Sequence, residues 1–327
     1  MTQPLLSELG RQGHELTVAA LPWVAPVYEA MAECKHVMVL PFSRGSLEWS
    51  KRRDWASTIQ GQFDEAYVCP NSFKSALLPF LAGIPLRVGY TGEMRWGLLS
   101  HRLPNPSKQT RSSMVKFYLA MSQWASKGSA ALHSASLVPK LTIDAQLQQA
   151  VWARFGLHEK QYIAMAPGAE YGDAKRWPEE RFCELIANTE SPVVLLGSAS
   201  DRAVGDAIVQ GVNALGFSHV RNLAGQTQLS EAMAMIGGAA GLVSNDSGLM
   251  HIAAALGVPQ VALFGSSSPE HTPALSSKAQ MIWLKWDPTY QPTLACAPCF
   301  KRVCPLAHKR CMWDISAQSV LARMRAW

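Results

Sequence analysis

Long apolar runs are absent from this sequence. None reaches the roughly 18 residues that a membrane-spanning helix requires, although 48% of the 327 residues are hydrophobic. Charge is also sparse, at 17% of residues, a composition typical of a folded globular protein and not of a disordered one. The first residues have neither the basic start nor the long apolar core of a signal peptide. We therefore expect a cytoplasmic globular protein, and its length suits two domains of about 150 residues each.

Acidic residues are the scarcer charged class: 24 Asp and Glu stand against 30 Lys and Arg, which gives a net charge of +6. The basic excess gathers in two stretches, because residues 74–116 hold seven basic residues against one acid and residues 296–327 hold six against one. Such patches attract the phosphates of lipids, nucleotides or nucleic acids. No nucleic-acid-binding motif accompanies them, so we expect no nucleic-acid partner.

Cysteine is uncommon, with seven residues, and three of them are scattered as small core residues usually are: Cys34, Cys69 and Cys183. The other four form the pattern Cys296-x2-Cys299-x4-Cys304-x6-Cys311, and His308 lies among them. A cluster of this kind in a cytosolic chain can hold zinc. Its spacing matches no common zinc finger, so we expect no metal there and a reduced, loop-stabilising or occasionally oxidised cluster, with zinc as the alternative.

Strand-like apolar runs alternate with helical patterns, which predicts an α/β protein whose parallel sheets carry helices on both faces. In the first half, strands are predicted at 16–20, 37–40, 66–69 and 87–90, and helices at 22–32, 47–60, 75–82 and 112–127. In the second half, strands are predicted at 162–166, 193–196, 242–243, 261–264 and 281–284, and helices at 145–155, 178–189, 199–215, 229–236, 249–256 and 315–325. Weak periodicity around Pro139 places the boundary between domains 1–140 and 141–327, and the second domain ends in the cysteine-rich segment 296–311 and a C-terminal helix.

The stretch 241–265 predicts a strand, a sharp turn, a short helix and a second strand. The helix therefore begins at the carboxyl end of a parallel strand, where open α/β sheets bind ligands. Its N-terminal N–H groups and dipole suit an anion such as phosphate. Ser247 and His251 are four residues apart and share one helix face. An ordinary strand–helix unit with a core histidine is the alternative interpretation.

Four segments, in this order, closely resemble glycosyltransferase family 9, the heptosyltransferases, and the resemblance covers nearly the whole chain: Pro70-Asn71-Ser72-Phe73-Lys74-Ser75, Gly92-Glu93-Met94-Arg95, the loop at 167–178 and Ser244-Asn245-Asp246-Ser247-Gly248-Leu249-Met250-His251. The resemblance implies a GT-B fold, in which two Rossmann-like domains face a central cleft, with the acceptor on the N-terminal domain and the nucleotide sugar on the C-terminal one. It implies inverting transfer of L-glycero-D-manno-heptose from ADP-heptose to the heptosyl-Kdo–lipid A inner core of lipopolysaccharide. It implies no redox cofactor, and it leaves a divalent cation open.

The resemblance assigns the donor residues. Lys175 matches the lysine that binds the diphosphate, and donors aimed at a leaving group's developing charge make the largest catalytic contribution. Glu170 and Tyr171 share its loop, where relatives contact phosphates or sugar, and we expect Glu170 at sugar hydroxyls. Asp201 matches an acidic position at the ribose. The remaining donor residues, whose amides and side chains would meet phosphate or sugar, are Asp246, Ser247, Gly248 and His251.

Each assignment has a structural alternative. Lys175 could be a solvated loop lysine, Asp246 and Asp201 could be helix caps, and His251 could be a buried structural residue. On the acceptor side the resemblance implies Asn71, Ser72, Lys74, Glu93 and Arg95, with Lys74 and Arg95 suited to acceptor phosphates and Kdo carboxylates. A lipid acceptor and a basic 74–116 patch together predict peripheral contact with the cytoplasmic face of the inner membrane.

One departure concerns the start of the chain. The family begins with a strand, a Gly-Asp loop that carries the general base, and a helix, whereas Leu5, Leu6 and Leu9 already match that helix. The resemblance therefore places the first strand and the base Asp upstream of Met1. We expect a native start further upstream. The competing hypothesis is a truncated, catalytically inactive ADP-sugar-binding protein, and a less favoured one is a GT-B nucleotide-sugar epimerase.

Overall fold

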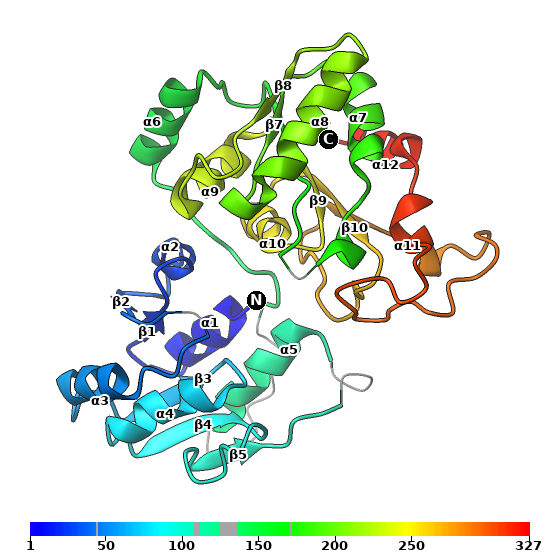
Figure 1. Ribbon diagram of the computed structural model, residues 1–327. Helices are drawn as coiled ribbons and strands as arrows, with labels where there is room; N and C mark the ends of the chain where they lie inside the picture. Colours follow the sequence, from blue (N-terminus) through cyan, green and yellow to red (C-terminus); the bar gives the residue numbers. More distant parts are fainter. Residues whose placement is uncertain (44, 108–111, 125–135, 171) are drawn as a thin grey trace. The chain divides into compact units, whose positions relative to one another are not determined.

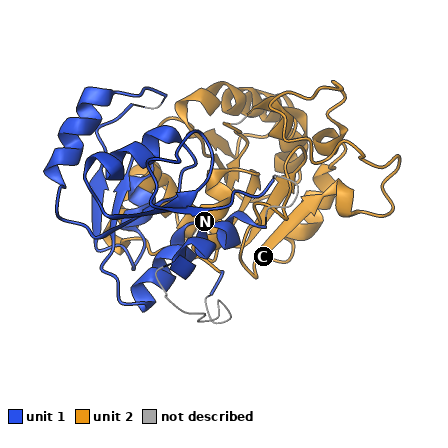
Figure 2. Cartoon of the chain, turned by 90° about the horizontal axis from the view of Figure 1, so that it is seen from below, with its two compact units in different colours: residues 1–137 blue, residues 138–327 orange. Residues whose placement is uncertain are grey.

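The computed structural model describes residues 1–43, 45–107, 112–124, 136–170 and 172–327 (Figure 1). The chain divides into two compact units, residues 1–137 and 138–327, drawn blue and orange in Figure 2. The division falls close to the boundary after residue 140 that the sequence suggests. Within the described residues, no helix is both long and apolar enough to cross a membrane.

Unit 1 alternates helices and short parallel strands. Its elements are α1 (Gln3–Arg11), β1 (Thr17–Ala20), α2 (Ala25–Glu29), β2 (His36–Val39), α3 (Trp49–Thr58), β3 (Glu65–Val68), α4 (Phe73–Leu81), β4 (Leu86–Tyr90), β5 (His101–Leu103), α5 (Met114–Leu119) and η1 (Ala120–Trp124). Its described strands form two parallel sheets, β1-β2 and β3-β4-β5. One apolar cluster joins the two sheets, because Met38 of β2 and Ala66 of β3 pack against the same buried residues, among them Leu78 of α4.

Unit 2 contains one larger sheet. Its elements are α6 (Ala145–Phe155), β6 (Ile163–Ala166), η3 (Asp173–Lys175), α7 (Glu179–Ala187), β7 (Val193–Leu195), η4 (Ala199–Asp201), α8 (Arg202–Ala214), β8 (Val220–Asn222), α9 (Leu229–Gly238), β9 (Gly241–Asn245), α10 (Gly248–Ala255), β10 (Gln260–Phe264), β11 (Ala279–Trp283), η5 (Leu284–Trp286), α11 (Arg310–Trp313) and α12 (Ala317–Met324). The six strands are all parallel, in the order β11-β10-β9-β6-β7-β8.

Helices cover both faces of this sheet. Side chains alternate between the faces along a strand, and in β10 Val261 and Leu263 join the cluster that contains residues of α7, α8 and α12. Ala262 and Phe264 instead pack with Met250 of α10. From β6 the chain adds β7 and β8 on one side of the sheet, and it then adds β9, β10 and β11 on the other side. The carboxyl ends of β6 and β9 are therefore the topological switch point, where open α/β sheets bind ligands.

The predicted α/β alternation is confirmed, and α6 has the predicted bounds. Its ends are set by local chemistry: an Asp144 carboxylate oxygen accepts the N–H of Leu147 at 2.8 Å, and Gly156 ends the helix at a φ of 57°. The predicted helix at 22–32 is wrong in length, because α2 spans only Ala25–Glu29. Strands β5 and β8 and helix α11 were not predicted, since three or four residues carry too little periodicity.

Candidate active site

The candidate site is built on the carboxyl ends of β6, β9 and β10, which lie side by side. Ala166 of β6 is paired with Ser244 of β9, and Asn245 of β9 is paired with Leu263 of β10. The loops that follow these strands therefore leave the same edge of the sheet. They are the 167–178 loop, the Asp246–Ser247 turn that leads into α10, and the serine-rich loop that begins at Gly265.

An ion pair joins the first two loops. The Lys175 ammonium donates to a carboxylate oxygen of Asp246 at 2.6 Å, and the two side chains are only 19% and 6% exposed. The hydroxyl of Thr272 donates to the other carboxylate oxygen of Asp246 at 3.3 Å. Asp246 is thus held from two sides, and Lys175 is placed at the switch point. A solvated loop lysine would not be expected in this position.

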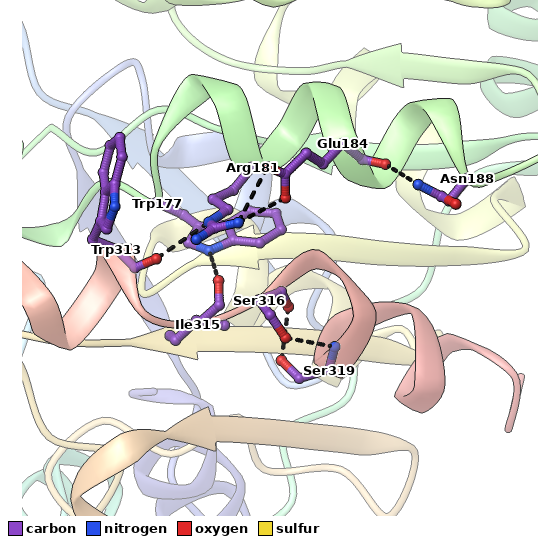
Figure 3. A network of polar contacts seen from close by, with 8 residues as sticks. All are labelled: Trp177, Arg181, Glu184, Asn188, Trp313, Ile315, Ser316 and Ser319. Atoms are coloured by element: carbon purple, nitrogen blue, oxygen red, sulfur yellow. Dashed lines mark hydrogen bonds and ion pairs between the residues drawn. The ribbon is translucent and has the colours of Figure 1, made fainter. Parts of the chain in front are cut away.

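The loop that carries Lys175 is fastened on both sides of the lysine. The Asn245 amide, fully buried, donates to the Pro167 carbonyl at 2.8 Å, and its oxygen accepts the N–H of Trp177 at 3.0 Å. The Trp177 indole donates in turn to the Ile315 carbonyl at 2.9 Å. Figure 3 shows this bond beside the Arg181 side chain, which donates to the Trp313 carbonyl. The C-terminal segment therefore fixes the Lys175 loop.

The N-terminus of α10 offers hydrogen-bond donors. The first-turn N–H groups of a helix have no acceptors within it, and a Cβ on Gly248 would meet no described atom within 4 Å. Within the described residues, the hydroxyl oxygens of Ser247, Ser266 and Ser267 are buried without a hydrogen-bond partner. Unpaired buried hydroxyls are costly, so these three fit a polyanionic ligand that would accept from them. Ser266 and Ser267 were not predicted; the signal was a run of serines one residue after a buried strand.

His251 lies one turn further along α10, half-buried. Burial lowers the pKa of its imidazole to about 4, and the charges of Asp246 and Lys175 act on it in opposite directions. The imidazole is therefore neutral at pH 7, able to donate one hydrogen bond and accept another. The structure thus brings five predicted donor residues together: Lys175, Asp246, Ser247, Gly248 and His251.

The other predicted donor residues are placed differently. An Asp201 carboxylate oxygen accepts the N–H and the hydroxyl of Ser198, at 2.9 and 2.7 Å, in a capping box. It also packs against Gly168, where an added Cβ would lie 2.3 Å from its carboxylate carbon. Asp201 is therefore at the site's edge but serves as a cap, and its contact with a ribose stays a prediction. Glu170 is exposed at the start of the loop, and Tyr171 lies outside the described residues.

The predicted acceptor residues gather in unit 1 around the start of α4. Arg95 is 1% exposed, and its guanidinium donates to the Pro70 carbonyl at 2.9 Å, to the Asn71 side-chain oxygen at 3.0 Å and to the Tyr90 carbonyl. The Ser72 hydroxyl caps α4 by accepting the N–H of Ser75. Arg95 therefore shapes the turn that presents Asn71, and its contact with an acceptor anion is left without geometric support.

Glu93 and Lys74 complete this group. A Glu93 carboxylate oxygen accepts the N–H of Phe73 at 3.2 Å, at the start of α4. Glu93 and Met94 hold φ angles of 44° and 53°, a left-handed backbone that is strained for such residues and that fixes a sharp turn. The Lys74 ammonium donates to the Gly45 carbonyl at 2.8 Å. All five predicted acceptor residues thus belong to one local cluster.

Among the described residues, the switch-point site contains no group of side chains already arranged around a metal position. Over residues 1–327, leaving out the segments that the structure does not describe, no three His, Cys, Asp or Glu side chains stand in an arrangement that could hold a metal ion. The seven cysteines are all unpaired thiols. The hydrogen-bond donors at the switch point are an ammonium, backbone N–H groups, hydroxyls and a neutral imidazole, a donor set that suits phosphate oxygens.

Known proteins resemble this chain over most of its length. Residues 52–309 match the model of glycosyltransferase family 9 (heptosyltransferase). Lipopolysaccharide heptosyltransferase 2 of Escherichia coli is 41% identical over 82% of this chain and 79% of its own length. Lipooligosaccharide heptosyltransferase 2 of Haemophilus influenzae is 37% identical over 82% of this chain and 80% of its own.

Solved structures agree. The structure of E. coli ADP-heptose lipopolysaccharide heptosyltransferase II has a TM-score of 0.80 at 35% identity and covers 99% of this chain and 93% of its own. An E. coli heptosyltransferase, WaaC, with ADP has a TM-score of 0.70 at 17% identity and covers 99% and 94%, which supports the fold alone. The chain belongs to glycosyltransferase family 9, the heptosyltransferases, and has the GT-B fold.

Proposed function

We propose that this protein transfers L-glycero-D-manno-heptose from ADP-heptose to the heptosyl-Kdo–lipid A inner core of lipopolysaccharide, with inversion at the anomeric carbon. The names of its relatives at 37–41% identity support heptosyl transfer to lipopolysaccharide, and the name of the E. coli enzyme of similar structure supports ADP-heptose as the donor. The observation that carries the proposal is the Lys175–Asp246 ion pair beside the N-terminus of α10, together with the buried, unpartnered hydroxyls of Ser247, Ser266 and Ser267 in loops at the same sheet edge. A nucleoside diphosphate is the ligand that uses all of these donors.

Each group at this junction has a distinct role. The α10 N-terminus and the hydroxyls of Ser247, Ser266 and Ser267 bind phosphate oxygens. Lys175 moves its hydrogen bond from Asp246 toward the diphosphate, whose charge grows as the glycosidic bond breaks, and this stabilises the departing ADP. Neutral His251 donates to a sugar or phosphate oxygen. No redox cofactor is required, because heptosyl transfer oxidises nothing.

The acceptor binds to unit 1 near Asn71 and Lys74. The turn that contacts the start of α4 through Glu93 continues into Met94 and Trp96, which are 73% and 63% exposed. Exposed apolar and aromatic side chains next to a basic stretch suit the interface of an anionic membrane. Peripheral contact of unit 1 with the cytoplasmic face of the inner membrane would bring the lipid-linked acceptor to the enzyme.

The test is an assay with ADP-heptose and purified heptosyl-Kdo–lipid A. ADP release and the mass of the lipid product are measured together for the native chain and for Lys175→Met. Lys278→Met, at an exposed lysine of the same unit, is the control for that variant. We expect acceptor-dependent ADP release and a product one heptose heavier. Calorimetric binding of ADP-heptose without transfer would instead identify an ADP-sugar-binding protein. A converted sugar nucleotide in the absence of acceptor would identify an epimerase.

A further inference from the structure

The four cysteines of the 296–311 segment share one cavity. The cavity has a volume of about 20 Å³, and its wall includes Ala174 and Ser266 together with the four thiol-bearing residues Cys296, Cys299, Cys304 and Cys311. A space of roughly 10–15 Å³ accommodates one sphere the size of a water molecule. Cysteines from both ends of the segment thus line one cavity that is large enough for a single ion or water molecule.

The backbone around this cavity is irregular yet held in strained conformations. Residues 287–309 contain no helix or strand, and a stretch of this length without secondary structure is uncommon in a compact domain. Phe300, Ala307 and Lys309 have φ angles of 52°, 58° and 45°. Left-handed φ at residues with a side chain persists where surrounding interactions enforce it. A cross-link inside the segment would supply that enforcement.

We propose that Cys296, Cys299, Cys304 and Cys311 bind one Zn²⁺ ion. Four thiolates are a closed tetrahedral ligand set for zinc, and a Cys-x2-Cys pair is the usual first half of such a set. His308 and Lys309 also line the cavity.

Binding requires a local rearrangement. The side chains do not converge on one point in the described chain, since no three of them form a metal-holding group. They line the same small cavity, so zinc binding would require the four thiols to turn toward its centre. The thiols lose their protons as the metal binds, which makes zinc affinity rise with pH.

A zinc ion here would also stabilise the loop that carries Lys175. Ala174, in the cavity wall, donates its N–H to the Arg302 carbonyl at 3.0 Å, and Phe300 donates to the Ser266 carbonyl at 2.8 Å. An ion pair links Lys309 to Asp173. The segment therefore contacts both the loop of Lys175 and the serine loop after β10. A zinc ion that rigidifies the segment would also restrict the motion of these two loops. This inference does not depend on the identity of the sugar or of the acceptor.

The experiment measures metal on the full chain, purified under reducing conditions from zinc-supplemented medium. We expect about one zinc ion per chain by elemental analysis, and a thiolate-to-metal charge-transfer band after exchange with Co²⁺. The double variant Cys296→Ser/Cys299→Ser should lose both signals, whereas Cys34→Ser, at a cysteine of unit 1, should keep them. Removal of zinc by a chelator should lower the melting temperature of the unsubstituted chain, and added zinc should restore it.

Two results would overturn the proposal. The first is a folded, reduced, unsubstituted chain that holds less than about a tenth of an equivalent of zinc and gives no cobalt band. The second is a disulfide among the four cysteines in the protein isolated from cells with its thiols trapped by alkylation. Both readouts use the unsubstituted chain, so a variant that fails to fold leaves the test intact.

Discussion

The Lys175 ammonium and the Asp246 carboxylate, 2.6 Å apart, tie together the loops that follow two neighbouring strands, β6 and β9. The two residues are 71 positions apart in the sequence. A lysine held this way is already ordered before any ligand arrives, so little conformational entropy is lost when it turns to a phosphate. Under the proposed function, Asp246 is therefore the partner that holds Lys175 until a diphosphate replaces it.

Removal of the Lys175 charge should be the most damaging change to catalysis. We expect Lys175→Met to lower kcat by about 10²–10³-fold, the usual effect of losing one donor to a developing charge. Steady-state ADP release at saturating acceptor measures it. Lys278→Met, at an exposed lysine, is the matched control and should keep full activity. An unchanged kcat in Lys175→Met would contradict the assigned role.

The coupling between Lys175 and Asp246 can be measured by a double-mutant cycle. Asp246→Asn keeps the shape of the side chain and removes its charge, and we expect the effects of Asp246→Asn and Lys175→Met on kcat/KM to be non-additive by about 1–3 kcal/mol. The second substitution should cost little once the first is present. Additive effects would mean that the ion pair has no part in catalysis.

His251 should make stability depend on pH. Its pKa is about 4 in the folded protein and near 6.5 in the unfolded chain, so the unfolded state binds more protons between these values. The His251 contribution is therefore fully present above pH 6.5 and is lost as the pH falls toward 4. Urea unfolding of the native chain and of His251→Gln at pH 4.5 and pH 7 measures it. The variant should lose less stability on acidification, and parallel losses in both proteins would refute the lowered pKa of His251.

Gly172 should be intolerant of a side chain. Its φ is 144°, and a Cβ there would stand 2.4 Å from the Arg302 carbonyl oxygen. Gly216 is the control, because its φ is 87° and no described atom lies within 4 Å of an added Cβ. Its substitution therefore measures the cost of backbone strain without a steric clash. We expect Gly216→Ala to cost about 1 kcal/mol and Gly172→Ala clearly more, with weaker ADP binding in Gly172→Ala alone. Unfolding curves measure the stability of each variant, and calorimetry measures its ADP binding. Equal losses of stability would show that the Arg302 carbonyl moves away from the added Cβ at little cost.

Arg95 should matter for the stability of unit 1. Arg95→Met leaves buried carbonyl groups and Asn71 without their donor, and each unpaired group costs about 1–3 kcal/mol. Arg102→Met, at an exposed arginine on β5, is the control and should stay within about 0.5 kcal/mol of the native chain. Chemical unfolding followed by fluorescence gives both values. A stable Arg95→Met protein with weakened acceptor binding would assign Arg95 to the acceptor instead.

Sequence reasoning went furthest where local chemistry decides the outcome. The bounds of α6 follow from Asp144 and Gly156, and the position of Lys175 follows from its loop motif. It failed where the decisive contact is remote or the element short. The three-residue β8 has no periodicity, and the exposure of a guanidinium such as that of Arg95 depends on carbonyl groups that the fold brings around it. Ser266 and Ser267 could not be assigned to the site from the sequence, because only the pairing of β10 with β9 places their loop beside the Asp246–Ser247 turn.

The bond between Trp177 and Ile315 has a consequence for synthesis. Its partners are 138 residues apart in the sequence, and a ribosome adds about 5–20 residues per second. The sheet of unit 2 can gather its first strands while the rest of the chain is still being made, but the Lys175 loop settles only after the segment around Ile315 has emerged. Under the proposed function, competence to hold a nucleotide sugar would then be among the last properties that a nascent chain acquires.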